Sequence, residues 1–108
     1  IVSARTTPHT RSEYQTVSSR PAMPQTPQNK DLFQEIQQIG KGLEIPVVEE
    51  LRQGVSDANI IAREGTAVID GLGPIGAKDH SEDEYIIKQS LIDRTLLFAH
   101  ILNSLNRT

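Results

Sequence analysis

The sequence contains no cysteine and no tryptophan, and only four of its 108 residues are aromatic. The absence of cysteine excludes a disulfide scaffold, a zinc finger built on thiolates and a cysteine nucleophile. No apolar run approaches the roughly 20 residues of a membrane helix, and the first residues lack the apolar core of a signal peptide. The pI is near 5.5 and basic residues do not cluster, which argues against a nucleic-acid-binding surface. We therefore expect a cytoplasmic protein whose partners are neither membranes nor nucleic acids.

Apolar residues are also scarce, at 36%, so the core is expected to be lean. Residues 1–29 contain four of the six prolines and carry a net charge of +2, whereas residues 30–108 contain all seven glycines and carry −5. This division predicts an extended arm or edge strand in residues 1–24, ending in a proline-rich hinge, and a folded unit in residues 25–108. Because the chain begins with Ile1 rather than methionine, we expect a fragment or a processed piece.

Three segments have the apolar spacing of helices, and their predicted N-caps are Thr26, Ser56 and Ser90. Gly40 and Gly42 are expected to end the first helix in a left-handed conformation. The third and longest helix carries a broad apolar stripe.

Two short apolar segments, residues 45–49 and 66–70, are predicted strands, and residues 13–19 are a weaker candidate for an edge strand. The order helix, strand, helix, strand, loop, helix indicates an α/β fold with parallel strands. Two strands make an incomplete sheet, so we expect these strands to belong to a larger sheet.

The residues Gly54, Val55 and Ser56 form a turn in front of the second predicted helix, and we call them the capping turn. Backbone N–H groups of such a turn favour anions, which makes a substrate carboxylate a natural guest. The simpler interpretation is an ordinary serine-capped helix.

A glycine-rich loop at residues 71–76, which includes Gly73 and Gly76, follows the second predicted strand. Its glycines have Gly-x-Gly-x-x-Gly spacing, but no helix opens directly after them, so a dinucleotide site is not predicted. The glycines instead indicate a sharp turn and a close approach to another element.

His80 lies in an acidic loop beyond the end of that strand, where α/β folds bind ligands. A neutral imidazole there suits a metal ligand or a general base. The simpler interpretation is a solvated histidine, because one histidine does not make a metal site. The adjacent Glu49 and Glu50 similarly suit either a metal ligand paired with a general base or a solvated strand end.

The order of these motifs resembles the C-terminal portion of one family, the zinc-dependent exopeptidases and deacylases of metallopeptidase family twenty. That family includes glutamate carboxypeptidase, acetylornithine deacetylase and succinyl-diaminopimelate desuccinylase. The resemblance extends from about Tyr14 to the end of the chain. It rests on Arg-Pro-Ala-Met-Pro at residues 20–24, Thr-Pro at 26–27, Gly-Val-Ser-Asp-Ala-Asn at 54–59, Asp-Gly-Leu-Gly-Pro-Ile-Gly at 70–76 and Asp-His-Ser-Glu-Asp-Glu-Tyr at 79–85.

The resemblance implies that residues 25–108 are part of a parallel-sheet catalytic domain, and that residues 1–24 are the end of a lid or dimerisation domain with its hinge. It implies that His80 is a metal ligand in a centre of two zinc ions, or of cobalt or manganese, in the intact enzyme. The implied partners are the remainder of the catalytic domain and, in the intact enzyme, a second copy in a homodimer. The substrate would be an N-acyl amino acid or a peptide, contacted by Gly54, Val55, Ser56, Gly73 and Gly76.

The chain departs from the family where the rest of the metal site would be. The family uses a His-x-Asp pair, a bridging aspartate and a glutamate pair, and no His-x-Asp occurs here. Glu49 and Glu50 occupy the predicted strand before the capping turn, whereas the family's pair lies far upstream of the lid domain, so we do not assign them to it. We predict an inactive C-terminal piece of a zinc-dependent amidohydrolase. The alternatives are a non-catalytic interaction module or split-enzyme subunit of the same family, and an unrelated small anion-binding domain.

Overall fold

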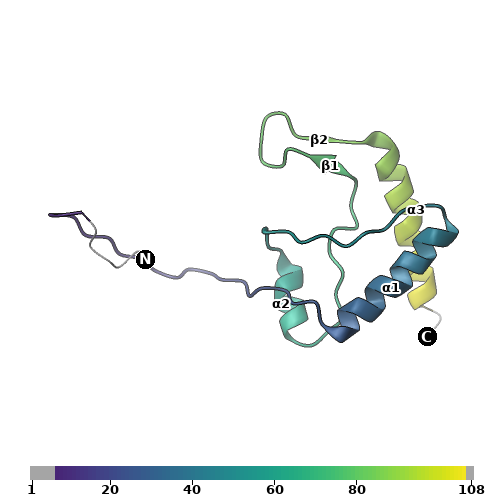
Figure 1. Cartoon of the computed structure of the whole chain (residues 1–108), viewed down its shortest axis with the longest axis horizontal. Coiled ribbons are helices and arrows are strands. Elements are labelled where there is room, and N and C mark those ends of the chain that lie inside the picture. The colour runs from purple at the N-terminus through teal and green to yellow at the C-terminus, as the bar shows by residue number, and fades with distance from the viewer. Residues whose placement is uncertain (1–6, 107–108) are drawn as a thin grey trace.

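The computed structural model describes residues 7–106, which form three helices and one small sheet (Figure 1). This content confirms the coarse expectation of a fold that mixes helix and sheet. The elements in chain order are α1 (Pro27–Gly42), α2 (Asp57–Arg63), β1 (Gly76–Ala77), β2 (Tyr85–Ile86) and α3 (Lys88–Leu105). The sheet consists of β1 and β2, which pair as an antiparallel hairpin.

The first described residues extend away from the helices (Figure 1). We call residues 7–19 the arm and residues 20–25 the linker, and neither contains a helix or a strand. Every residue of the arm is exposed. The extended conformation agrees with the predicted arm, whereas the edge strand at residues 13–19 is not formed. Residues 1–6 of the predicted arm lie outside the described range.

α1 begins as the sequence predicts. The hydroxyl of Thr26 accepts a hydrogen bond from the backbone N–H of Asn29 at 3.2 Å, so Thr26 is the N-cap. Pro27 is the first helical residue, where its missing N–H leaves no intrahelical bond unmade.

The end of α1 differs from the prediction, because Gly40 and Gly42 both lie within the helix. The residue with left-handed backbone is Glu44, with φ of 58°. The predicted glycine stop is therefore wrong. Gly40 instead allows a close approach of the following segment, since a Cβ at this position would lie 2.6 Å from the carbonyl oxygen of Ile45 and 2.7 Å from Cγ2 of Val47.

The predicted cap of the last helix is also wrong. α3 starts at Lys88, and Ser90 lies in its first turn. The hydroxyl of Ser90 donates to the carbonyl of Ile87 at 2.5 Å and accepts from the N–H of Ile75 at 2.8 Å. Ser90 therefore ties α3 to the glycine-rich loop rather than capping the helix.

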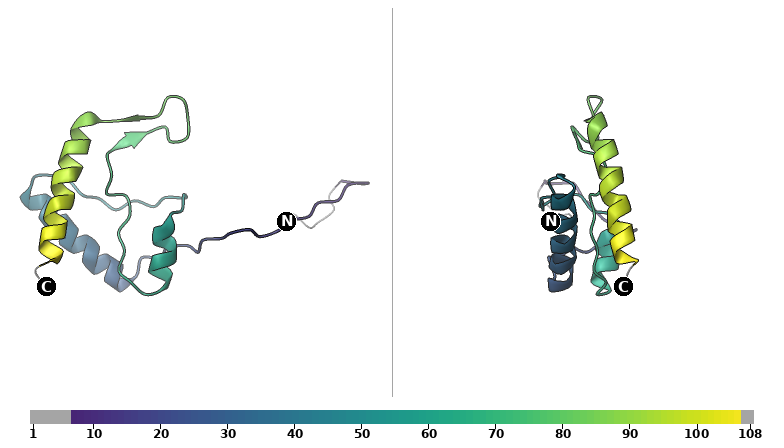
Figure 2. Two further views of the ribbon diagram at one scale, coloured as in Figure 1. Left: turned by 180° about the vertical axis from the view of Figure 1, so that it is seen from behind. Right: turned by 90° about the vertical axis from the view of Figure 1, so that its right-hand side faces the viewer.

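The core is small and lies between α1 and α3, which pack against each other (Figure 2). Its buried apolar residues are Ile36 of α1, Val47, and Leu97 and Ile101 of α3. Partly buried side chains from α1 and from the two extended segments surround this cluster.

Residues 45–49 and 66–70, the predicted strands, are extended but are not paired with any strand among the described residues. Side chains of α1 supply bonds to each. Gln37 Nε2 donates to the carbonyl of Val47 at 3.1 Å, and the N–H of Val68 donates to Asn29 Oδ1 at 2.7 Å. A strand needs a neighbouring strand to form its ladder, and residues 7–106 supply none to these segments.

Much of the apolar stripe of α3 is exposed. Six of its side chains are between 43% and 64% exposed, namely those of Leu91, Ile92, Leu96, Phe98, Leu102 and Leu105. A helix normally buries its apolar stripe against another element, and within residues 7–106 α1 covers only part of this one. No helix in the described part of the chain has the length and apolar character needed to cross a membrane.

Replacing Leu97 with alanine should lower the free energy of unfolding by about 3 kcal/mol, because a fully buried side chain would leave a cavity. The matched control is Leu96→Ala in the same helix, where the side chain is 47% exposed and the loss should be about 1 kcal/mol or less. Urea denaturation followed by circular dichroism measures both. Equal losses at the two positions would contradict the described core.

Candidate functional site

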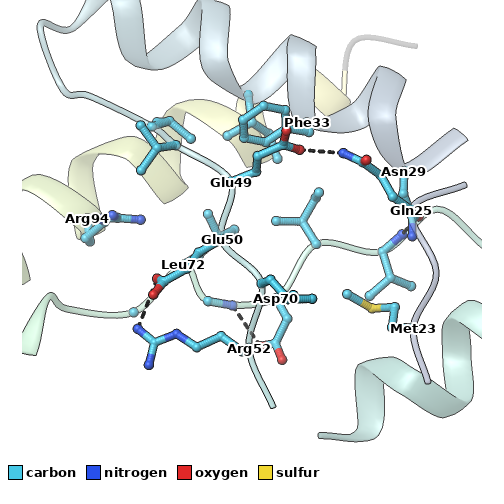
Figure 3. A pocket seen from close by; sticks show the side chains of 18 of the residues that line it. Met23, Gln25, Asn29, Phe33, Glu49, Glu50, Arg52, Asp70, Leu72 and Arg94 are labelled. Carbon is cyan, nitrogen blue, oxygen red and sulfur yellow. Dashed lines mark hydrogen bonds and ion pairs between the residues drawn. The ribbon is translucent and has the colours of Figure 1, made fainter. Parts of the chain in front are cut away.

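A cleft of about 720 Å³ opens between α1, the linker and the two extended segments (Figure 3). α1 contributes Phe33 and Ile36 to one wall, and the glycine-rich loop forms another. The volume lies in the range of small-molecule sites. Of the residues predicted from the sequence, Gly73 and Gly76 line this cleft.

Charged side chains occupy the rim of the cleft, and most have partners. Glu49 accepts a short hydrogen bond from Gln25 Nε2 in the linker. Glu50 Oε2 lies 3.2 Å from Arg52 Nη2. Arg94 of α3 is half-buried and has no hydrogen-bond or ion-pair partner within residues 7–106.

Ser56 holds the capping turn in place. Its hydroxyl accepts from the N–H of Ala58 at 3.2 Å, and its own N–H donates to Asn59 Oδ1 at 3.0 Å, which confirms the predicted N-cap of α2. The same hydroxyl donates to Asp70 Oδ2 at 2.6 Å. Asp70 directly precedes the glycine-rich loop, so the capping turn and this loop meet through the bond between Ser56 and Asp70.

The other two residues of the capping turn face solvent. Gly54 has no atom within 4 Å of the position that a Cβ would occupy, and Val55 is 59% exposed. None of the three residues of the capping turn lines the cleft. The structure therefore places the capping turn beside the glycine-rich loop but outside the cleft that Gly73 and Gly76 line.

His80 lies in the loop of the hairpin, residues 78–84, which projects away from α1 (Figure 1). Ser81 folds this loop, since its hydroxyl donates to the carbonyl of Lys78 at 2.7 Å and accepts from the N–H of Asp83 at 3.2 Å. His80 is exposed and its backbone is left-handed, with φ of 64°. The imidazole is thus presented on the surface and does not line the cleft.

Arg52 connects the rim of the cleft with the hairpin loop. Besides Glu50, it contacts Asp79, the neighbour of His80, with 3.7 Å between Nη1 and Oδ2. All three side chains are more than half exposed, so these ion pairs contribute little to stability. They nevertheless place the His80 loop next to the end of the first extended segment.

The described residues do not complete a metal site. Residues 7–106 contain no group of three or more histidine, aspartate and glutamate side chains that could hold a metal ion. His80 offers one nitrogen ligand, whereas a catalytic zinc ion takes three protein ligands. The described residues near His80 therefore do not by themselves supply the ligands of a zinc ion.

Three residues of this region were not predicted from the sequence as site residues: Arg52, Asn59 and Asp70. Asn59 occupies the third helical position after a serine cap, where a side chain that accepts from the cap N–H is favoured. Asp70 precedes a glycine at a sharp turn, and its Oδ1 accepts from the N–H of Gly71 at 2.8 Å. Both positions carry a local signal, whereas the contact of Arg52 with Asp79 depends on how distant segments fold together.

The chain was compared with protein-family models, curated proteins and solved structures. No protein-family model matches this chain, and neither does any curated protein or solved structure. A functional interpretation therefore depends on the motifs and on the geometry described above.

Replacing Gly76 with alanine should disrupt the hairpin, because the added Cβ would overlap the carbonyl oxygen of Tyr85 on the partner strand. We expect a cost of about 2 kcal/mol and faster hydrogen exchange of the Ile87 N–H, which bonds to the carbonyl of Ile75 at 2.8 Å. The control is Gly73→Ala, which meets no atom within 4 Å and should leave this exchange rate unchanged. Unchanged exchange in both variants would contradict the observed pairing.

Proposed function

We propose that this chain is the C-terminal part of the catalytic domain of a zinc-dependent amidohydrolase that cleaves N-acyl amino acids or C-terminal peptide bonds. The observation that carries this proposal is the convergence of motifs that lie far apart in the sequence. Asn59 Nδ2 donates to the carbonyl of Pro21 at 2.8 Å, and Ser56 donates to Asp70 at 2.6 Å. The linker, the capping turn and the glycine-rich loop therefore meet around the start of α2, as the parts of a single site would.

His80 is the proposed metal ligand. Its backbone is left-handed, as are those of His9, Glu44 and Lys78, so the support for His80 comes from the Asp-His-Ser-Glu-Asp-Glu-Tyr motif at residues 79–85. The hairpin holds an exposed imidazole in this conformation. Zinc, when bound, would activate water for attack on the amide carbonyl. The remaining zinc ligands and the general base would come from outside the described residues.

The other proposed site residues belong to the substrate side. Gly73 and Gly76 form part of the cleft wall. The side-chain position of Gly73 is open, which lets a substrate approach its backbone, whereas the side-chain position of Gly76 is filled by the carbonyl of Tyr85. Gly54, Val55 and Ser56 would border the substrate next to this wall, at the distance fixed by the bond between Ser56 and Asp70.

We also propose that residues 45–49 and 66–70 are strands of a parallel sheet that the remainder of the catalytic domain completes. Three observations support this: the segments are apolar and unpaired, the stripe of α3 is exposed, and Arg94 is half-buried without a partner among the described residues. In this proposal the intact enzyme is a homodimer whose lid domain precedes the linker.

A second candidate is a non-catalytic interaction module or split-enzyme subunit of the same family. The exposed apolar stripe of α3 favours it, because such a surface also fits a separate partner protein. The genomic reading frame upstream of the Ile1 codon distinguishes the two. Codons for His-x-Asp and for a glutamate pair support the enzyme, and a start codon close to Ile1 supports the module.

Replacing His80 with glycine should abolish amide hydrolysis by the protein expressed from its complete reading frame without lowering its free energy of unfolding. Glycine adopts the left-handed conformation freely, so we expect a gain of about 1 kcal/mol together with a loss of the metal ligand. Zinc content, hydrolysis of N-acyl amino acids and urea denaturation measure the three quantities.

The control for this variant is His100→Ala on α3, which is exposed and should leave hydrolysis unchanged. Full activity of the His80→Gly protein would remove His80 from the site. Nanomolar zinc binding by the 108-residue chain alone would show that the site is complete here and would also contradict the proposal.

A further inference from the structure

The buried amide of Asn59 joins two segments that lie far apart in the sequence. Asn59 is 8% exposed. Its Nδ2 donates to the carbonyl of Pro21 in the linker at 2.8 Å, and its Oδ1 accepts from the N–H of Ser56 at 3.0 Å. Both ends of the amide therefore have partners, one in the linker and one in the capping turn, as buried polar groups require.

The hydrogen bonds continue from the capping turn into the glycine-rich loop. The Ser56 hydroxyl donates to Asp70 Oδ2 at 2.6 Å, and Asp70 Oδ1 accepts from the N–H of Gly71 at 2.8 Å. A series of hydrogen bonds thus connects the linker with the loop that lines the cleft, passing first through the backbone N–H and then through the hydroxyl of Ser56.

The linker has a second contact with α2, but a weaker one. Arg20 Nη2 lies 2.9 Å from Asp57 Oδ1, and their side chains are 40% and 81% exposed. Exposed ion pairs contribute little and are screened by salt. Gln25 at the end of the linker also donates to Glu49, but this bond is exposed. The hydrogen bond from Asn59 to Pro21 is therefore the partly buried polar contact at the start of the linker.

We propose that Asn59 is a positioning residue that works as a latch: with the linker docked on it, the capping turn and the glycine-rich loop are held together, and with the linker released, both loosen. The latch would make the shape of the cleft wall depend on the position of the segment that precedes α1. Its role in catalysis rests on the proposed function, whereas its existence can be tested without any hydrolysis assay.

The most selective variant is Asn59→Asp. Aspartate keeps an oxygen for the Ser56 N–H and is favoured in the first turn of a helix, so α2 should remain capped. It lacks the donor for Pro21, and its carboxylate would repel the Pro21 carbonyl. The variant therefore breaks the linker contact and spares the capping box.

Two measurements read out the latch. Because the chain has no cysteine, spin labels can be placed on Val17→Cys in the arm, which is 91% exposed, and on Gln34→Cys, an exposed position of α1. Double electron–electron resonance then gives the distribution of distances between the two spin labels. Hydrogen exchange of the Gly71 N–H reports on the glycine-rich loop.

We expect Asn59→Asp to broaden the distance distribution and to accelerate exchange of the Gly71 N–H roughly tenfold, the effect of losing one buried hydrogen bond. The converse variant is Ser56→Ala, which interrupts the series on the other side of Asn59. Since coupling is reciprocal, it should also broaden the distance distribution. Arg11→Ala, which removes an arginine that pairs with Glu13 inside the arm, is the matched control and should change neither measurement.

A broadened distribution with unchanged Gly71 exchange in Asn59→Asp would overturn the latch, because the linker would then move without affecting the loop. An unchanged distribution in Asn59→Asp would overturn it as well. If α2 unfolds in that variant, Ser56→Thr and Ser56→Ala decide: the threonine hydroxyl should restore docking of the linker, and equal broadening in both would contradict the proposal. Failure of the zinc experiment leaves these outcomes unaffected, so the two proposals can fail separately.

Discussion

Two extended segments without a partner strand constrain the rest of this structure. Each of the segments 45–49 and 66–70 has one backbone group that is hydrogen-bonded to a side chain of α1, Gln37 or Asn29. These bonds hold the two segments against that helix. The cleft opens beside both segments. α3 also lacks a full set of neighbours. Only the side of α3 that faces α1 is buried, so the rest of its apolar stripe is exposed. A small core and a large exposed apolar surface are what part of a larger sheet would show.

The candidate site depends on this arrangement. The second extended segment ends at Asp70, where the chain turns into the glycine-rich loop, and Asp70 is also the residue that Ser56 contacts. The loop then leads through the hairpin to His80, and Ser90 fastens its end to α3. Hydrogen bonds therefore connect the cleft wall with the linker, and the ion pair of Arg52 with Asp79 brings the His80 loop to the rim of the cleft. The motifs themselves are spread over residues 20–85 of the sequence.

Local signals predicted the helices well and the sheet poorly. Thr26 and Ser56 cap the helices that the sequence assigns to them, because capping depends on residues within one turn. Ser90 fails as a cap, because its hydroxyl finds a better partner in Ile75, fifteen residues away in the sequence. The predicted strands have suitable residues, but a ladder needs a second strand. For the site, the motifs predicted that His80 and the glycine-rich loop follow one another along the chain, whereas the contacts of Asn59 with Pro21 and of Arg52 with Asp79 depend on tertiary folding.

The proposed function requires that His80 bind zinc in the intact amidohydrolase. Crystals of the protein expressed from its complete reading frame, grown with zinc and measured at the zinc absorption edge, test this binding. We expect an anomalous peak at about 2.0–2.1 Å from a ring nitrogen of His80, with further ligands from residues upstream of the described part. Zinc-saturated crystals with no peak at His80 would contradict it.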